Sequence, residues 1–237
     1  MEQNDNGLST ALTRETLDHL PLITFMEKAP LPWALKSHDS RYVYINEAAQ
    51  DFANIPANFD FEGRLDGEFP TPWAEFAADY QAHDRKAQAS PEGAEIITTS
   101  FFTRRAVLEP WYCAKFPVYD SQGGVLGTFC YAKRFTFLSL WDFCKQLKPS
   151  VISLTPPDDT FNEKELDIIF FAIQKLSAKE IAAALTLSHR TVENRLCTIY
   201  SKIGINSLSA LIDHCQATGL NHYIPRKRLR QGVNFFW

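Results

Sequence analysis

The stretch that decides the fold runs from Ser177 to Gly204 and reads SAKEIAAALTLSHRTVENRLCTIYSKIG. The order of its apolar and polar residues predicts a short helix, a tight turn and a longer helix. In the longer helix the apolar residues recur at intervals of four, three and four, which places them on one helical face: Val192, Leu196, Ile199 and Ile203. A helix pair of this size with a polar outer face is the geometry that lays a helix in the major groove of DNA.

The sequence before each of the first two helices predicts where they begin. Thr160 with Glu163, and Ser177 with Glu180, both fit the pattern S/T-x-x-E. In that pattern a hydroxyl and a carboxylate satisfy free backbone N–H groups at a helix start. We therefore expect helices over 161–175 and 178–185.

Two further helices are expected after these. The third begins after Ser188 and ends at Gly204, because glycine adopts the left-handed backbone conformation at low cost. A fourth helix starts at Asn206 and Ser207, with its apolar residues on one face: Leu208, Leu211, Ile212 and Cys215.

Residues 160–213 closely resemble the LuxR-type (GerE-type) helix-turn-helix family. The segments that match in register are Lys164-Glu165, 177–182, 185–188, Thr191-Val192, Ile199-Tyr200, 202–204 and Ser207. The departures are Lys175 where the family usually has Gly, Arg195 where it often has His, and Lys164 where it often has Arg. The resemblance implies an all-α four-helix DNA-binding domain, which we place at 160–220.

The same resemblance implies which side chains read DNA. The family's base-contacting positions correspond to Glu193, Asn194 and Cys197, and Asn and Glu suit adenine and cytosine respectively. Seven further residues on or near the third helix are expected to contact phosphates or to position the helix: Lys179, Ser188, Arg190, Thr191, Arg195, Tyr200 and Lys202. Glu193 is unusual, because other members often carry a basic residue there and a carboxylate repels phosphates.

The first half of the chain has a different texture, in which short strands alternate with helices. Strands are expected at 33–36 and 42–45, with Asn46 capping a helix over 47–53. A second helix is expected over 73–89, and three strands follow at 95–104, 106–117 and 124–134. The polar turn at 120–124 contains the glycines that a hairpin needs. This order predicts an antiparallel sheet with helices on one face, so the whole chain is expected to be α+β.

Residues 28–135 resemble a PAS domain. The resemblance rests on YVYINEAA at 42–49 and on WYCAKFPVYD at 111–120, followed by Gly124 and Gly127. It implies a sheet and a helical cover that enclose a sensor pocket. Five aromatic residues are candidates to line that pocket, although ordinary core packing would explain them equally well: Trp73, Tyr80, Trp111, Phe116 and Phe129.

No cofactor is expected in this pocket. The cysteine motif by which light-sensing relatives bind flavin is absent. His83 is the one candidate haem ligand, and a lone histidine on a helix is more often a surface or core residue.

Three segments lie outside the two domains. Residues 1–27 are expected to form an amphipathic leading helix, broken near Pro21. Residues 136–159 are expected to form a helix over 137–147, followed by a proline-rich acidic linker. The tail, 221–237, carries a basic cluster at 226–230 that is expected either to contact phosphates or to be solvated. Its three terminal aromatic residues are expected to dock on the protein, since three exposed rings would be unusual.

Composition is that of a folded protein. Of the 237 residues, 45% are hydrophobic and 22% charged. Residues 1–154 carry 14 Lys and Arg against 20 Asp and Glu, a net of −6, whereas 155–237 carry 10 against 8, a net of +2. An acidic front and a mildly basic back fit a sensor joined to a binder of polyanions.

Several classes of protein are disfavoured. The five cysteines are scattered, with no CxxC pair, so neither a disulfide framework nor a metal site is expected. A polar N-terminus and the lack of long apolar runs predict a cytoplasmic protein. No GxSxG, HExxH or phosphate-binding loop is present, so an enzyme is not expected.

The sequence thus predicts a transcription regulator that binds promoter DNA as a homodimer. A PAS-like domain controls it, either by sensing a signal, which could be a small-molecule ligand, or by mediating dimerisation. One alternative keeps DNA binding but uses an acyl-homoserine-lactone domain, because Phe69-Pro-Thr-Pro-Trp73 with Tyr80 and Asp84 loosely resembles that family. A second alternative is a protein-interaction module that does not bind DNA.

Overall fold

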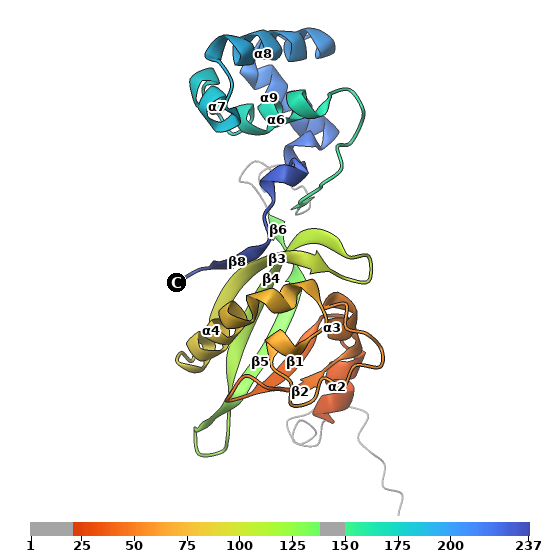
Figure 1. The fold of residues 1–237 in the computed structure, drawn as a ribbon, viewed down its shortest axis with the longest axis vertical. Coiled ribbons are helices and arrows are strands. Elements are labelled where there is room, and N and C mark those ends of the chain that lie inside the picture. Colours follow the sequence, from red (N-terminus) through yellow and green to blue (C-terminus); the bar gives the residue numbers. More distant parts are fainter. Residues whose placement is uncertain (1–20, 138–149) are drawn as a thin grey trace, which may run out of the picture.

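The computed structural model describes residues 21–137 and 150–237 and divides them between a sheet with helices and a cluster of helices (Figure 1). The sheet is antiparallel throughout and has the strand order β2-β1-β5-β4-β3-β8. Its strands are β1 (Trp33–Ser37), β2 (Tyr42–Ile45), β3 (Ala94–Phe102), β4 (Val107–Tyr119), β5 (Val125–Arg134) and β8 (Gly232–Phe235). The sixth strand, β8, comes from the C-terminal tail and was not predicted as a strand.

Helices cover one face of this sheet (Figure 1). They are α3 (Glu47–Phe52), the 3-10 turns η1 (Asp66–Glu68) and η2 (Pro72–Phe76), and α4 (Ala77–Gln88). The helix α2 (Leu22–Lys28) precedes β1, and its Phe25 ring lies 5.4 Å from that of Trp33. The expected helix over 73–89 is therefore a 3-10 turn that passes into an α-helix at Ala77. The expected α+β class, with a sheet covered on one face, is confirmed.

Asn46 ties the start of this domain together. Its Oδ1 accepts hydrogen bonds from the Ala49 N–H, as the predicted cap of α3, and from the Trp33 N–H, both at 2.9 Å. Its Nδ2 donates to the carbonyl oxygens of Met26 at 2.9 Å and Leu31 at 3.0 Å. One fully buried amide thus fixes the end of α2, the start of β1 and the start of α3 relative to one another.

Close strand packing explains one glycine of the PAS-like motif. A Cβ on Gly127 would lie 2.0 Å from the carbonyl oxygen of Lys36 on the neighbouring strand β1. Only glycine allows β5 to pair with β1 at this point.

The C-terminal helices are α6 (Glu163–Ala172), α7 (Ala178–Leu185), α8 (His189–Ile203) and α9 (Leu208–Thr218), followed by the 3-10 turns η3 (Leu220–His222) and η4 (Arg226–Arg228). Their core holds the apolar residues predicted from spacing. Val192, Ile199 and Leu211 are fully buried, and Leu196 and Ile203 pack against them half-buried.

Several of the predicted helix ends are confirmed, but both ends of the first helix are wrong, since it was expected over 161–175 and spans Glu163–Ala172. Ser177 and Glu180 form the expected capping box, and Gly204 ends α8 at φ 70°. The first box, however, is formed by Asn162 with Glu165 and not by Thr160 with Glu163. The asparagine side chain accepts from two backbone N–H groups of the first turn, so the helix starts two residues later than predicted.

A short pair of strands, β6 and β7, lies between the sheet domain and the C-terminal helices in the chain. Phe137 belongs to β6 (Thr136–Phe137), which pairs with β7 (Ser150–Val151), whereas the rest of the helix predicted over 137–147 lies outside the described residues. Of the predicted leading helix over 1–27, the described part forms α2 after Pro21. None of the helices in the described ranges is long and apolar enough to cross a membrane.

Candidate nucleic-acid interface and sensor cavity

The third helix of the C-terminal domain, α8, has one buried and one exposed face. The buried face packs on α7 and α6. The three predicted base-reading side chains, Glu193, Asn194 and Cys197, are all exposed and share the opposite face. The structure therefore brings the predicted readers together on one helical surface.

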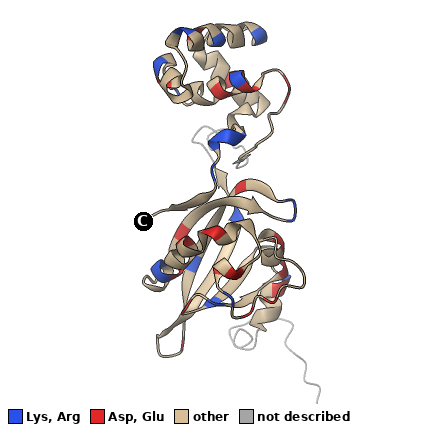
Figure 2. Cartoon of the chain, in the orientation of Figure 1, with Lys and Arg blue, Asp and Glu red and all other residues tan. Residues whose placement is uncertain are grey.

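The start of α8 is held rigidly. The Ser188 side chain accepts from the Thr191 N–H at 3.1 Å and lies 2.8 Å from the Thr191 hydroxyl. Arg190 is exposed in the first turn, and Lys179 is exposed in the first turn of α7. Figure 2 shows Lys and Arg distributed along α7 and α8, at the end of the domain far from the sheet.

Glu193 has a neighbour that the sequence analysis missed. The His189 Nδ1 lies 3.6 Å from the Glu193 Oε2, one helical turn away, and both side chains are more than half exposed. A histidine four residues before a carboxylate is the signal that could have revealed it.

Three of the predicted phosphate contacts are partly or fully engaged within the domain. Lys202 donates to Glu165 at 2.7 Å, so its geometry favours a structural role. Burial raises the pKa of Glu165, but the hydrogen bonds from Lys202 and from the Asn162 N–H hold it below its ordinary value. Arg195 and Tyr200 are half-buried, and Tyr200 packs against the helical core.

The basic cluster of the tail is also engaged. Lys227 forms an ion pair with Asp167, a nearly buried carboxylate on α6, and the Arg228 Nε lies 4.0 Å from the same carboxylate. Arg226 and Arg230 remain exposed. Two of the four basic residues therefore secure the tail to the helical domain.

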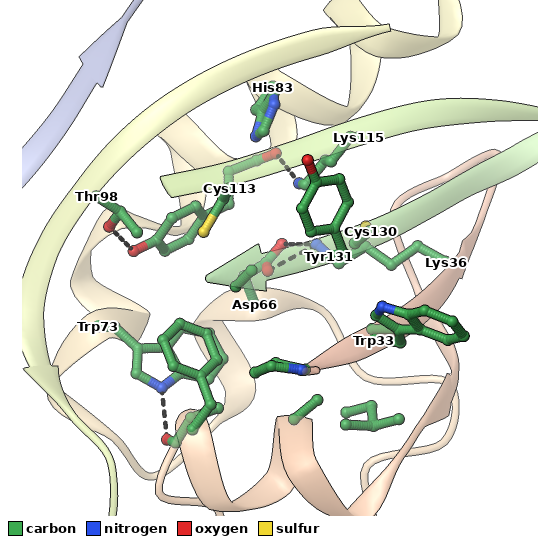
Figure 3. Close-up of a pocket in the computed structure, with 18 of the residues that line it drawn as sticks. Trp33, Lys36, Asp66, Trp73, His83, Thr98, Cys113, Lys115, Cys130 and Tyr131 are labelled. Carbon is green, nitrogen blue, oxygen red and sulfur yellow. Dashed lines mark hydrogen bonds and ion pairs between the residues drawn. The ribbon is translucent and has the colours of Figure 1, made fainter. Parts of the chain in front are cut away.

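The sheet and its helical cover enclose a cavity of about 100 Å³. This is well above the roughly 10–15 Å³ that one water molecule requires. Figure 3 shows its lining, which comes from β1, β2, α3, α4, β3, β4 and β5. Most of the lining surface is apolar, and the charged side chains in it are Lys36, Asp66 and Lys115.

The structure places two of the five predicted pocket residues in this cavity. Trp73 and Tyr80 line it, and each has a fixed polar atom. The Trp73 Nε1 donates to the Ala53 carbonyl at 2.8 Å, and the Tyr80 hydroxyl lies 2.6 Å from the Thr98 hydroxyl.

The other three predicted pocket residues lie elsewhere. Trp111 is buried beside the cavity, with its ring 4.5 Å from that of Phe52. Phe129 and Phe116 point to the opposite face of the sheet, because strand alternation turns their neighbours Cys130 and Lys115 inward. The sequence analysis recognised these residues as aromatic but did not use the alternation of β4 and β5 to choose between faces.

Four buried charged side chains were not predicted: Lys36, Asp66 and Lys115 line the cavity, and Asp84 forms ion pairs with both lysines. Lys36 donates to Asp66 at 2.7 Å and to Asp84 at 3.0 Å. Lys115 pairs with Asp84 and donates to the Tyr80 carbonyl at 2.9 Å. Lys115 shares its strand face with Trp111 and Cys113, so period-two alternation was the signal that could have found it.

The pairing keeps Asp84 and Lys36 charged. Burial alone would raise the pKa of Asp84, but Lys115 and Lys36 hold it well below its ordinary value. Burial alone would lower the pKa of Lys36, but Tyr42, Asp66 and Asp84 hold it above its ordinary value. Burial raises the pKa of the Cys113 thiol to about 12, so this thiol is protonated.

His83 is buried and neutral. Its Nε2 lies 2.9 Å from the Ala94 carbonyl oxygen, which accepts only, so Nε2 carries the hydrogen. Burial, reinforced by Lys115, lowers the pKa of His83 to about 3. Within the described ranges, no three His, Cys, Asp or Glu side chains are grouped to hold a metal ion.

Comparison with known proteins agrees with the family resemblance inferred for each half of the chain. Residues 26–136 match the PAS fold, and residues 159–215 match the family of bacterial regulatory proteins called the luxR family. The PAS match decides against the acyl-homoserine-lactone alternative for the first half.

Individual relatives are similar to the chain over different lengths. The Fimbriae Z protein of Escherichia coli K12 is 38% identical over 55 residues, which is 23% of this chain and 26% of that protein. The chain thus spans about a quarter of the curated relatives that it matches.

Two solved structures match the chain over a much larger share of its length. The VqmA–ligand–DNA complex of Vibrio cholera is 25% identical with a TM-score of 0.73, covering 93% of this chain and 98% of that one. A phage VqmA–DPO complex is 24% identical with a TM-score of 0.68, covering 94% and 98%.

Proposed function

Since the chain is a bacterial regulatory protein of the luxR family with an N-terminal PAS domain, we propose that it binds promoter DNA as a homodimer under the control of a small molecule held in that domain. The observation that carries this proposal is the exposed face of α8. The three predicted base-reading side chains lie there, opposite an apolar face whose fully buried Val192 and Ile199 hold the helix in place.

Two subunits are expected because one recognition helix reads only a few bases. The helix α9 is the proposed contact between the two DNA-binding domains. Its Leu211 and Cys215 are buried in the core, while Ile212 is half-exposed and available for contact with a second copy.

Similarity to a relative whose structure was solved with DNA supports the proposal that this chain binds DNA. A TM-score of 0.73 over 93% of the chain requires both domains to superpose, because the PAS match at 26–136 covers less than half of the sequence. The two domains of this chain are therefore held much as they are in a relative whose complex contains DNA and a ligand. We place the sensor domain at 28–135 and the DNA-binding domain at 160–220, in the cytoplasm, where promoter DNA is found.

The cavity favours a small, uncharged and largely apolar ligand. Its two buried lysines and two buried aspartates already neutralise one another, so a charged ligand would leave one ion without a partner. The protonated thiol of Cys113 and the paired hydroxyls of Tyr80 and Thr98 offer neutral polar atoms instead.

The test of DNA binding starts with selection of fragments bound by the purified full chain, followed by sequencing. Alanine at Glu193, Asn194 or Cys197 should weaken binding to the selected site, by about 1–3 kcal/mol for a residue that makes a good base contact. Gln174→Ala, an exposed change in the turn after α6, should leave binding unchanged. Unchanged binding in all three reader variants would refute the assignment of the readers.

Salt dependence separates DNA binding from the protein-interaction alternative. Affinity for the selected DNA should fall steeply with salt, and Lys179→Ala should reduce the slope by about one unit if its amine contacts a phosphate. Binding that does not depend on salt would count against the proposal.

The sensor proposal is tested by extracting the purified chain and identifying any released small molecule by mass spectrometry. Cys113→Phe adds a ring to the cavity lining and should abolish the signal, whereas Phe116→Ala on the opposite face should retain it. Equal release from the wild type and Cys113→Phe would show that the molecule is bound elsewhere.

A further inference from the structure

The last residues of the chain return to the sensor domain after the DNA-binding domain has been completed. Strand β8 pairs antiparallel with the edge strand β3 over four residue pairs, from Gly232 with Thr99 to Phe235 with Ile96. The Ser100 hydroxyl adds a hydrogen bond of 3.1 Å to the Gln231 side chain. Figure 1 shows β8 along this edge, directly below the helical domain.

The side chains of this segment complete the covered face of the sheet. Val233 packs against the core of the sensor domain, and the Trp237 ring stacks on His83 of α4 at 5.8 Å and an interplanar angle of 30°. The Phe235 ring lies 4.8 Å from that of Trp237, and the Lys86 amine lies 5.9 Å from the Trp237 ring centre. All three terminal rings remain partly exposed, Phe235 at 37%, Trp237 at 49% and Phe236 at 56%.

Between α9 and β8 the chain is fixed to the helical domain and to the linker. Lys227 and Arg228 lie against Asp167 on α6. The Ile224 N–H donates to the Ser153 carbonyl at 2.9 Å, and the Ser153 N–H donates to the His222 carbonyl at 2.9 Å. The tail is therefore a continuous connection from the DNA-binding domain to the sensor sheet, running alongside the linker.

We propose that the C-terminal segment 231–237 is a second tether that fixes the DNA-binding domain on its sensor and so sets the spacing between the two half-sites that the homodimer accepts. This rests on the proposed function. A single proline-containing linker would leave each DNA-binding domain free to adopt many orientations. A second attachment removes most of that freedom, so the two recognition helices are presented at one separation and with a high effective concentration for paired half-sites.

The tether also touches the cavity directly. Ile96 and Thr98 line the cavity, and they are the β3 partners of Phe235 and Val233. His83, on which Trp237 stacks, lines the cavity as well. A ligand that moves any of these three residues therefore acts on the tether without an intermediate element.

The experiment compares three forms of the full dimer: wild type, a chain ending at Gln231, and Trp237→Ala, which keeps β8 but removes the stacking on His83. Phe236→Ala is the matched control, since this neighbouring ring is the most exposed of the three and the stacking on His83 is made by Trp237. Each is titrated with duplexes that carry two selected half-sites at a series of spacings, and with a duplex that carries one half-site.

Wild type and Phe236→Ala should bind one spacing best. The truncated chain should lose about tenfold or more in affinity at that spacing, and it should bind all spacings similarly. Affinity for the single half-site should be unchanged in every form, because the recognition helix is intact. Trp237→Ala should fall between the truncated chain and wild type.

Two results would overturn the proposal. One is a truncated chain that keeps both the affinity and the spacing preference of the wild type. The other is an equal loss on paired and single half-sites, which would mean that the tail contacts DNA or supports the helical domain itself. If the wild type bound no DNA at all, the proposed function would fail instead. Small-angle scattering would still test the tether, which predicts a larger radius of gyration for the truncated chain and an unchanged one for Phe236→Ala.

Discussion

Acid should destabilise the sensor domain through His83. This histidine is fully buried, and its pKa in the folded protein is about 3, whereas the unfolded value is about 6.5. Between these two values the unfolded chain binds a proton that the folded chain does not. The free energy of unfolding therefore falls as pH falls below about 6.5 and levels off near the folded pKa. At pH 5 the pKa difference gives a loss of about 2 kcal/mol relative to neutral pH.

Denaturant unfolding of the wild type and of His83→Gln at pH 7.5 and pH 5 measures this effect. Glutamine keeps a donor for the Ala94 carbonyl and does not titrate. Its free energy of unfolding should therefore change less between the two pH values than that of the wild type, by about 2 kcal/mol. A control, Gln174→Ala, changes an exposed residue that does not titrate and should retain the wild-type pH dependence. If His83→Gln lost as much stability on acidification as the wild type, the buried neutral state of His83 would be refuted.

Three further outcomes follow from single contacts. Asn46→Ala leaves buried backbone groups at Met26, Leu31 and Trp33 without a partner, and it should cost about 3 kcal/mol or more of sensor-domain stability in denaturant unfolding. Ile199→Ala opens a cavity in the helical core and should cost about 2–5 kcal/mol while leaving the cavity-bound molecule detectable by mass spectrometry. Lys175 has a φ of 64°, so Lys175→Gly should stabilise the helical domain by roughly 1 kcal/mol, and a lower melting temperature would contradict this.

The helical domain could be predicted from the sequence to within a few residues. The apolar spacing of α8, the capping serines at 177, 188 and 207 and the terminating Gly204 act within one or two turns of chain. The first capping box was misplaced because Thr160 and Asn162 both precede a suitable acid three residues later. The structure uses Asn162, whose partner Glu165 is also bound by Lys202 from another helix.

The sensor cavity could be predicted only in outline. Tyr80 and Trp73 were expected there, but the residues that set its chemistry are 30 to 48 positions apart in the ion pairs Lys36–Asp66 and Lys36–Asp84. Charged side chains are normally expected on the surface, so their burial follows only when three elements converge. The tail illustrates the same limit, because nothing local in 231–237 indicates that β3 has a free edge.

The sequence by itself determined the two families, the identity of the recognition helix and the side of it that faces outward, because these depend on periodicities and caps within single helices and strands. Only the tertiary structure decided which aromatic residues face the cavity, that four charges are buried beside it, and that the C-terminal strand joins the sensor sheet. These features arise from contacts between distant segments, whose free energy depends on burial and on shared hydrogen bonds that no single segment contains.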